Sequence, residues 1–265
     1  MDIIVLKNSD MGIIAIFIAL LSFVLYRMKV GYSSEILIAA VRNFIQLIFL
    51  AYILQFIFNN DEPWQLLLIS IVMLLIAGWE IHLRQEYRLK RRQSLWIGTL
   101  SLSITTFFLT WFSLQVVIMP EPWYTPQYAI PMLGILLGNT MNGISLGMNT
   151  MTQNIYQQRH IIEQRLMLGQ TAQESIRDIR NASIRTGLIP IVNSMAVAGL
   201  VSLPGMMTGQ ILSGTEPMIA VYYQIMIYYL ITASSGFSIV ISTWQISRSV
   251  FDERDRLIIS RLSKK

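Results

Sequence analysis

The chain has no cysteine, only two histidines and few charged residues. Asp, Glu, Lys and Arg together make up 13% of its 265 residues. The absence of cysteine excludes disulfides, thiolate nucleophiles and cysteine-bound metals. The two histidines, His82 and His160, belong to no cluster of metal-ligand residue types in the sequence. We therefore expect no tight, prebuilt metal site.

The sequence signatures of ATP hydrolysis and of intramembrane proteolysis are missing as well. No lysine follows a glycine, so the Gly-Lys-Ser/Thr of a phosphate-binding loop is absent. HExxH is also absent, and no Asp lies inside the long apolar runs described next. We therefore expect a protein without catalytic residues or a cofactor of its own, rather than an enzyme. Any uphill transport would take its energy from a partner or from an ion gradient.

Long apolar runs are what the chain has in abundance. Hydrophobic residues make up 54% of it, and the mean hydropathy is +0.52. Seven runs approach the length of about 20 residues that a helix needs to cross about 30 Å of hydrocarbon. They lie at 11–26, 36–58, 64–82, 95–119, 128–148, 188–203 and 219–244. These runs predict an all-α integral membrane protein, in which residues 1–265 form one transmembrane domain of seven helices.

Charge alternates between the segments that connect the runs. All but two of the 20 Lys and Arg residues lie in the segments that begin at Arg27, Arg84, Met151 and Gln245. The other connections contain only acidic charges, namely Asp61, Glu62, Glu121 and Glu216. Cytoplasmic loops favour Lys and Arg, so we expect a multi-pass protein of the cell (inner or plasma) membrane. Its N-terminus would lie outside and its C-terminus in the cytoplasm. The net charge of +5 follows from this topology, and we do not expect nucleic-acid binding.

The longest soluble stretch, residues 151–187, is predicted to form a cytoplasmic helix, a break and a second helix. Gly169 is the residue type that commonly follows a helix end. Thr171 and Glu174 then have the spacing of a capping box, in which each side chain bonds the backbone amide of the other residue. The second helix includes Ile179.

Apolar residues near this break have two interpretations. Ile161, Leu166 and Leu168 lie in a stretch that is expected to be in water beside the membrane. Exposed apolar clusters of this kind tend to mark a contact surface. The alternative is that the three side chains pack back on the membrane helices.

The fifth and sixth runs are the best candidates for a transport pathway. Broken or short membrane segments mark such pathways, because unsatisfied backbone survives only beside a cavity or inside protein. The sixth run is about 24 Å long by helix rise, and Pro204 interrupts it before a second short helical piece at 206–214. The fifth contains Asn139 and Asn142, which either line the pathway or tie helices together. Its glycines serve either the pathway or close helix packing; they are Gly134, Gly138, Gly143 and Gly147.

Three polar residues share one face of the second run. Glu35, Arg42 and Gln46 are seven and four residues apart, which keeps them near one helical stripe. Arg42 lies about 10 Å from the cytoplasmic end by helix rise, where a charge is costly unless it faces protein or water. It either extends to the inner headgroups, pairs with Glu80, or contacts the substrate.

Methionines also lie near the proposed pathway. Met141, Met206 and Met207 carry thioethers, which are soft metal ligands. Methionine is equally a filler of irregular cores, and both interpretations stay open. A metal ion would be held weakly by oxygen ligands such as Glu35 or Glu216, or would travel as a complex.

Four stretches resemble a known family. Glu163, Gly169 and Ile179 have the spacing of the EAA signature of ABC-transporter permeases, although Gln164 and Arg165 stand where that signature has alanines. The other three are AVRNFIQL at 40–47, PMLGILLGNTMNG at 131–143 and SLPGMMTGQIL at 202–212. With these motifs the chain is similar to the FetB-type permeases over most of its length. That family includes bacterial iron-export permeases and plant relatives linked to aluminium tolerance.

The resemblance implies an ABC permease subunit that exports iron or a related metal. A separate ABC ATPase subunit would bind ATP and Mg, and two permease chains would form a homodimer with two ATPase chains. Coupling to the ATPase is expected at Glu163, Leu166, Gly169, Thr171, Glu174 and Ile179. The candidate translocation pathway consists of Glu35, Arg42, Gln46, Asn139, Met141, Asn142, Met206 and Met207. Two alternatives remain: an ABC permease for another solute such as a nucleotide-sugar, and a self-sufficient secondary transporter.

Overall fold

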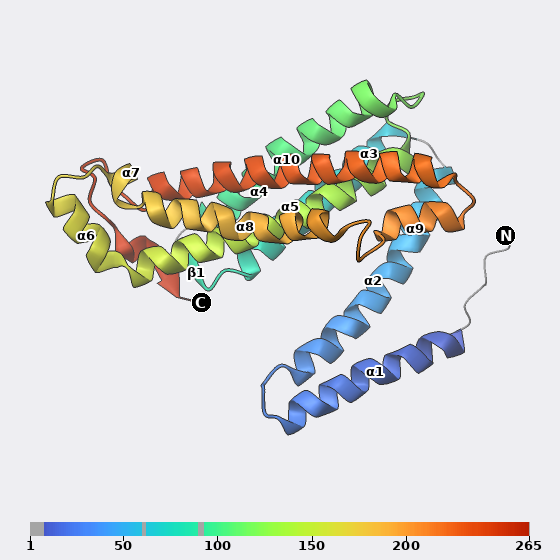
Figure 1. The fold of residues 1–265 in the computed structure, drawn as a ribbon, viewed down its shortest axis with the longest axis horizontal. Helices are drawn as coiled ribbons and strands as arrows, with labels where there is room; N and C mark the ends of the chain where they lie inside the picture. Colours follow the sequence, from blue (N-terminus) through green and yellow to red (C-terminus); the bar gives the residue numbers. More distant parts are fainter. Residues whose placement is uncertain (1–7, 60–61, 90–92, 265) are drawn as a thin grey trace. The chain divides into compact units, whose positions relative to one another are not determined.

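The computed structural model describes residues 8–59, 62–89 and 93–264, which form two compact units (Figure 1). The first unit runs to Glu62 and includes residues 212–214, and the second comprises Pro63–Ile211 and the chain from Thr215 onward. Some charged residues used to predict the topology lie outside the described residues: Asp61, Lys90, Arg91, Arg92 and Lys265.

The first unit is a helical hairpin made of α1 (Asn8–Arg27) and α2 (Ser33–Asn59). The chain reverses through left-handed residues at Lys29 (φ 56°) and Gly31 (φ 78°). The Ser22 hydroxyl donates to the Ser33 carbonyl at 2.8 Å and joins the two helices near this turn. Both helices are apolar around most of their circumference, as expected for helices surrounded by lipid or protein.

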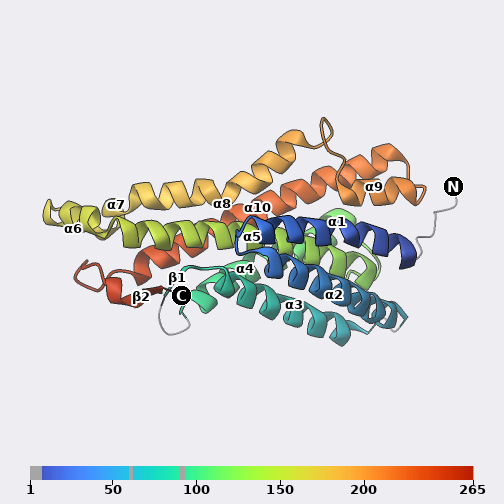
Figure 2. The same cartoon turned by 90° about the horizontal axis from the view of Figure 1, so that it is seen from below.

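The second unit is built on five long helices. They are α3 (Pro63–Leu83), α4 (Gln93–Phe112), α5 (Pro126–Gln157), α8 (Arg177–Val197) and α10 (Pro217–Ser249). A short π-helix, η1 (Ser113–Ile118), continues α4. The central helix is α5, which packs against α3, α4, α8 and α10. Figure 2 shows α8 bending along its second half, which contains Pro190.

Small hydroxyl side chains fill much of the interface between α4, α5 and α10. The Thr140 hydroxyl of α5 donates to the Ser234 hydroxyl of α10 at 2.8 Å, and Thr105 of α4 is hydrogen-bonded to Ser238 of α10. Thr106 instead donates to the Leu102 carbonyl one turn earlier, at 2.6 Å. Small residues allow helices to approach closely in a membrane, and these bonds satisfy their hydroxyls there.

Short elements lie at the two ends of this unit. One end carries α6 (Arg159–Met167), α7 (Ala172–Ser175), β1 (Tyr87–Leu89), η2 (Ile259–Arg261) and β2 (Leu262–Lys264). The other end carries α9 (Gly205–Leu212), as Figure 1 shows. Strands β1 and β2 pair antiparallel, with Leu89 opposite Leu262, so the C-terminal segment returns to the connection that follows α3. The described parts of three basic connections therefore share one end, as the charge alternation predicts.

Six helices among the described residues are long and apolar enough to cross a membrane, which confirms the membrane class but not the predicted count of seven. These spans are Asp10–Arg27, Ser33–Phe58, Pro63–Leu83, Gln93–Ile118, Pro126–Gln157 and Pro217–Ser249. Helix α8 does not qualify, because its first half carries the charges of Arg177, Asp178, Arg180 and Arg185.

The predicted sixth run, 188–203, ends too late, and it continues the second helix of the cytoplasmic segment without a break. Helix α8 begins at Arg177 and ends at Val197. Its polar first half continues the helix along α5. The helix ends early because Gly199 takes a left-handed conformation (φ 79°) and its amide donates to the Ser202 carbonyl at 2.9 Å, closing a turn. The predicted second helical piece is present as α9.

Candidate functional site

The segment between α5 and α8 has a defined structure with the predicted break. Helix α6 ends in a Schellman motif, in which the amides of Gly169 and Gln170 donate to the carbonyls of Leu166 and Arg165 at 3.0 and 3.1 Å. Gly169 adopts φ +89°, which L-residues rarely take, so a glycine fits this position without strain. The break thus comes from a specific motif rather than from an unstructured loop.

The predicted capping box starts the next helix, α7. The Glu174 amide donates to the Thr171 hydroxyl oxygen at 3.4 Å, and the Thr171 amide donates to Glu174 Oε2 at 2.9 Å. These hydrogen bonds to the carboxylate, first from the Thr171 backbone and then from its hydroxyl, hold the pKa of Glu174 below its ordinary value. Thr171 and Glu174 therefore shape the segment, as the spacing predicts.

Arg165 joins the end of α6 to the helices that follow. Its guanidinium donates to the Ser175 carbonyl at 3.0 Å and to Asp178 Oδ2 at 3.0 Å. The first bond satisfies a carbonyl at the end of α7, and the second reaches the first turn of α8. Arg165 stands where the family signature has an alanine, and in this chain its side chain fixes the angle of the segment.

The apolar residues of the segment divide between the core and the surface. Ile162, Ile176 and Ile179 are buried in the main core, and Leu166 packs partly against it. Met167 and Leu168 are 79% and 84% exposed. The packing interpretation therefore holds for Leu166, and the exposure that a contact surface requires is present at Leu168.

The exposed apolar pair lies beside charged groups. A hollow at this tip is lined by Arg165, Leu168, Gly169, Gln170, Glu174, Arg177 and Asp178. Glu163 is exposed on α6, and its carboxylate Oε2 lies 3.7 Å from His160 Nδ1. Polar groups around one or two protruding apolar side chains are the usual anatomy of a small docking surface.

Two glycines bring α5 and α8 into backbone contact on the membrane side of this segment. A Cβ atom at Gly187 would lie 2.8 Å from the Gly143 carbonyl oxygen and 2.9 Å from Ile239 Cδ1 of α10. One turn along, a Cβ at Gly147 would lie 3.4 Å from the Ser183 carbonyl oxygen. Gly143 and Gly147 are thus packing residues. Their partners Ser183 and Gly187 were missed in the sequence, although the two have the same four-residue spacing of small residues.

The two asparagines of α5 make different bonds. Asn139 is exposed, and its amide donates to the Ile135 carbonyl of its own helix at 2.9 Å. Asn142 accepts from Arg84 Nη1 at 2.6 Å, and Arg84 Nε also lies 3.4 Å from Glu80 Oε1. Glu80 therefore has a basic partner just past the end of α3, and the bond from Arg84 to Asn142 ties this end of α3 to α5.

The other predicted pathway residues are not gathered at one place. Met141 packs partly against the main core, and Met206 packs on the Ile191, Ile227 and Ile231 cluster of α8 and α10. Met207 is half-buried in α9. Glu35, Arg42 and Gln46 are exposed on α2 in the first unit. Among the described residues, no three His, Cys, Asp or Glu side chains form a cluster that could hold a metal ion.

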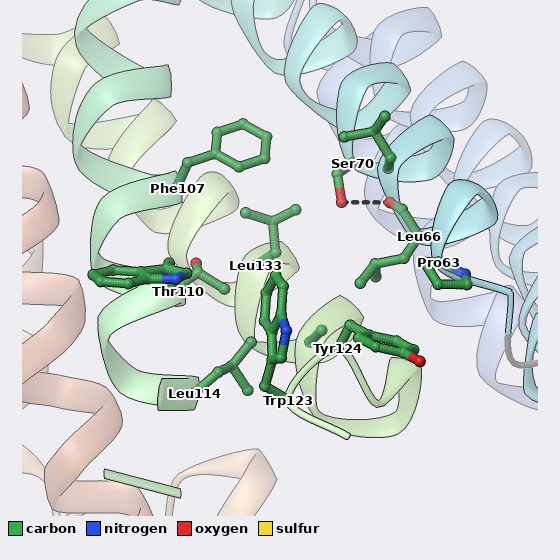
Figure 3. Close-up of a pocket in the computed structure, with 12 residues that line it drawn as sticks. Pro63, Leu66, Ser70, Phe107, Thr110, Leu114, Trp123, Tyr124 and Leu133 are labelled. Carbon is green, nitrogen blue, oxygen red and sulfur yellow. Dashed lines mark hydrogen bonds between the residues drawn. The ribbon is translucent and has the colours of Figure 1, made fainter. Parts of the chain in front are cut away.

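An apolar cavity of about 310 Å³ lies at the end of the unit away from α6. Figure 3 shows Phe107, Leu133 and the ring of Trp123 around it, with Ser70 bonded to the Leu66 carbonyl. Its walls come from α3, α4 with η1, and the start of α5, and they offer few polar groups. It contains none of the predicted pathway residues, and its chemistry suits an apolar occupant rather than an ion.

Comparison with known proteins gives matches along nearly the whole chain. The family model described as "Uncharacterised protein family (UPF0014)" matches residues 8–251. The "UPF0014 membrane protein slr1647" of Synechocystis sp. is 39% identical over 94% of this chain and 94% of its own length. The "Probable iron export permease protein FetB" of Escherichia coli is 29% identical over 98% of both chains. "Protein ALUMINUM SENSITIVE 3" of Arabidopsis thaliana is 29% identical over 96% of this chain and 92% of its own. No solved structure matches.

Proposed function

Because this chain belongs to the UPF0014 family, we propose that it is the permease subunit of an ABC transporter that exports iron or a related metal. The observation that carries the proposal is the tip of the segment between α5 and α8. There Met167 and Leu168 protrude at the end of α6, which Arg165 bonds to the end of α7. Support for the metal comes from the relative named as a probable iron export permease.

The proposed mechanism transmits force from this tip to the membrane. A partner ATPase that binds ATP and Mg would press on α6, and Arg165 would pass the displacement to α8. Since α8 meets α5 at Gly143 and Gly187, a displacement of its polar half would pivot about that contact and move its apolar half. One such segment per chain favours a homodimer of permease chains with two ATPase chains.

We infer seven crossings, with the segment in the cytoplasm of a cell whose inner or plasma membrane holds the protein. The C-terminal ends of α5 and α10 lie together, because β1 contacts α5 and pairs with β2, which follows α10. Two helices that run in the same direction require a return between them, and α8 with the loop at 198–204 supplies it. The basic connections favour the cytoplasm for this end.

The experiment compares two leucines of similar exposure, one before α8 and one after it. Leu168 is 84% exposed at the tip, and Leu200 is 87% exposed beyond the other end. If Leu168 anchors the ATPase, Leu168→Ser weakens association with the purified candidate ATPase subunit about tenfold, the size of one interface anchor. ATP hydrolysis linked to metal transport in liposomes falls with it, and Leu200→Ser leaves both unchanged.

Two results would reject the proposal. Equal binding by Leu168→Ser and the unaltered chain would remove the docking role of the tip. Metal transport by this chain alone, driven by a pH gradient in liposomes without ATP, would instead identify a secondary transporter.

A further inference from the structure

A groove of about 470 Å³ lies between α8 and α10 at the end that carries α6 and α7. Its lining consists of Gln173, Arg180, Ile184, Val240, Trp244 and Arg248. Figure 1 shows the two helices running side by side here, and they are in direct contact. None of these residues belongs to the proposed docking tip or pathway.

The two arginines lie at matching depths. Helices α8 and α10 run antiparallel, and Gly187 meets Ile239. Arg180 precedes Gly187 and Arg248 follows Ile239, so both lie on the same side of that contact, about 10 and 14 Å along their helices by helix rise. The guanidinium groups therefore occupy one layer of the molecule.

Apolar side chains occupy the adjoining layer, toward the membrane. Ile184 lies one turn from Arg180 on α8, and Val240 and Trp244 lie two turns and one turn from Arg248 on α10. Residues four apart share a helix face. On each helix the apolar side chains therefore lie on the same face as the arginine and closer to the membrane. Tryptophan is enriched where hydrocarbon gives way to headgroups, which places the arginines at headgroup level.

Neither arginine has a carboxylate partner among the described residues, whose ion pairs involve other side chains. Arg180 Nη1 donates to Gln173 Oε1 at 2.9 Å. The Arg248 guanidinium lies 3.9 Å from the centre of the Trp244 ring. A guanidinium has five N–H donors in a planar fork that matches phosphate oxygens, so most of this capacity stays available.

We propose that this groove binds one anionic phospholipid, with its phosphate on Arg180 and Arg248. The acyl chains lie along the apolar wall of Ile184, Val240 and Trp244. A free phosphate ion has no apolar part that could contact this wall. Basic sites between helices at the cytoplasmic surface are a recurrent way of binding such headgroups. Because Gln173 belongs to α7 and bonds Arg180, the lipid also stabilises the segment that carries the docking tip.

The test uses the purified chain alone, without an ATPase, so its result is independent of the proposed transport function. Native mass spectrometry in detergent measures binding of dioleoylphosphatidylglycerol, dioleoylphosphatidylcholine and inorganic phosphate. We expect the anionic lipid to bind and the other two not to compete with it. Arg180→Gln and Arg248→Gln each lower the affinity about fivefold, since a basic residue contributes about 1 kcal/mol at a membrane surface and 1.4 kcal/mol is tenfold.

Arg185→Gln is the matched control, because it removes the same charge from the same helix outside this groove. Equal weakening by Arg185→Gln would mean general attraction to a basic surface and would overturn the site. Competition by inorganic phosphate would replace the lipid with a free anion and also overturn it. A lower melting temperature of Arg180→Gln would mean that this variant loses binding through a loss of folding. Arg248→Gln then tests the site, because the Arg248 side chain makes no hydrogen bond to the described residues. Arg248→Lys, which keeps the charge, should retain more than half of the binding.

Discussion

Gly187 and Gly143 meet where α8 crosses α5, and the contact leaves no room for a methyl group. In Gly187→Ala the new Cβ would lie 2.8 Å from the Gly143 carbonyl oxygen. This backbone atom can move away only if α5 moves as a whole. Such overpacking costs about 1–3 kcal/mol, so we expect the free energy of unfolding to fall by that amount in detergent. Thermal unfolding of the purified chain measures it.

The matched control is Gly138→Ala on α5, the helix that Gly187 meets. A Cβ at Gly138 meets nothing within 4 Å, and alanine favours a helix over glycine. This variant should be as stable as the parent chain or slightly more so. Equal destabilisation by the two substitutions would contradict the packing role of Gly187.

The capping box makes a second prediction, which depends on pH. The folded pKa of Glu174 is below its ordinary value of 4.5, so its carboxylate stabilises the segment fully above that pH. The contribution is lost as pH falls through the lowered folded pKa. In Thr171→Ala the amides of α7 should exchange hydrogen about fivefold faster at neutral pH, the usual effect of losing a threonine cap.

Thr171→Ser keeps the hydroxyl and should exchange at the parent rate. Lowering the pH from 6 to 3 should destabilise α7 in the parent chain much more than in Glu174→Gln, whose side-chain amide does not titrate. The comparison is made after correction for intrinsic exchange rates. The same pH dependence in both chains would show that the box does not hold α7.

At the scale of elements, local signals were predictable and contacts between distant segments were not. Gly169, Thr171 and Glu174 act within a few residues of one another, so their spacing predicted the break and the cap correctly. The bond from Arg84 to Asn142 joins residues 58 positions apart, and nothing in either neighbourhood indicates it. In the sequence Arg165 is only a departure from the EAA signature. Its role depends on the angle at which α6 returns to α8, which the sequence does not specify.

That role makes a prediction for α6 as one element. Arg165→Ala removes two hydrogen bonds, one of them to an exposed carboxylate whose contribution is small in water. We expect α6 to open more often, with about fivefold faster hydrogen exchange at 162–167 and little change in α10. Arg177→Ala, which removes an exposed arginine nearby, is the control. Unchanged exchange in Arg165→Ala would mean that burial of Ile162 alone holds α6.

For the whole molecule, charge alternation predicted the common end of the basic connections, but hydropathy could not define the path of α8. The charges in its first half lower the mean hydropathy of α8 below that of a membrane span, and its apolar half ends early at Val197. The ends of α5 and α10 lie together because Tyr87 of β1 stacks on Tyr156 of α5 and β1 pairs with β2. Two short strands at 87–89 and 262–264 leave no clear pattern in the sequence. The crossing of α8 is thus the step on which the count of seven depends.

Single cysteines test that crossing directly, because the chain has none of its own. Leu168 and Leu200 flank α8 and are both highly exposed, and Ser263 is exposed in β2 at the tip end. If α8 returns across the bilayer, Leu200→Cys reacts with a membrane-impermeant maleimide in intact cells. Leu168→Cys and Ser263→Cys then react only after the membrane is opened. Reaction of Leu168→Cys and Leu200→Cys from the same side of the membrane would reduce the number of crossings to six. Reaction of Leu168→Cys in intact cells would place the docking tip outside the cell, where a cytoplasmic ATPase cannot bind it.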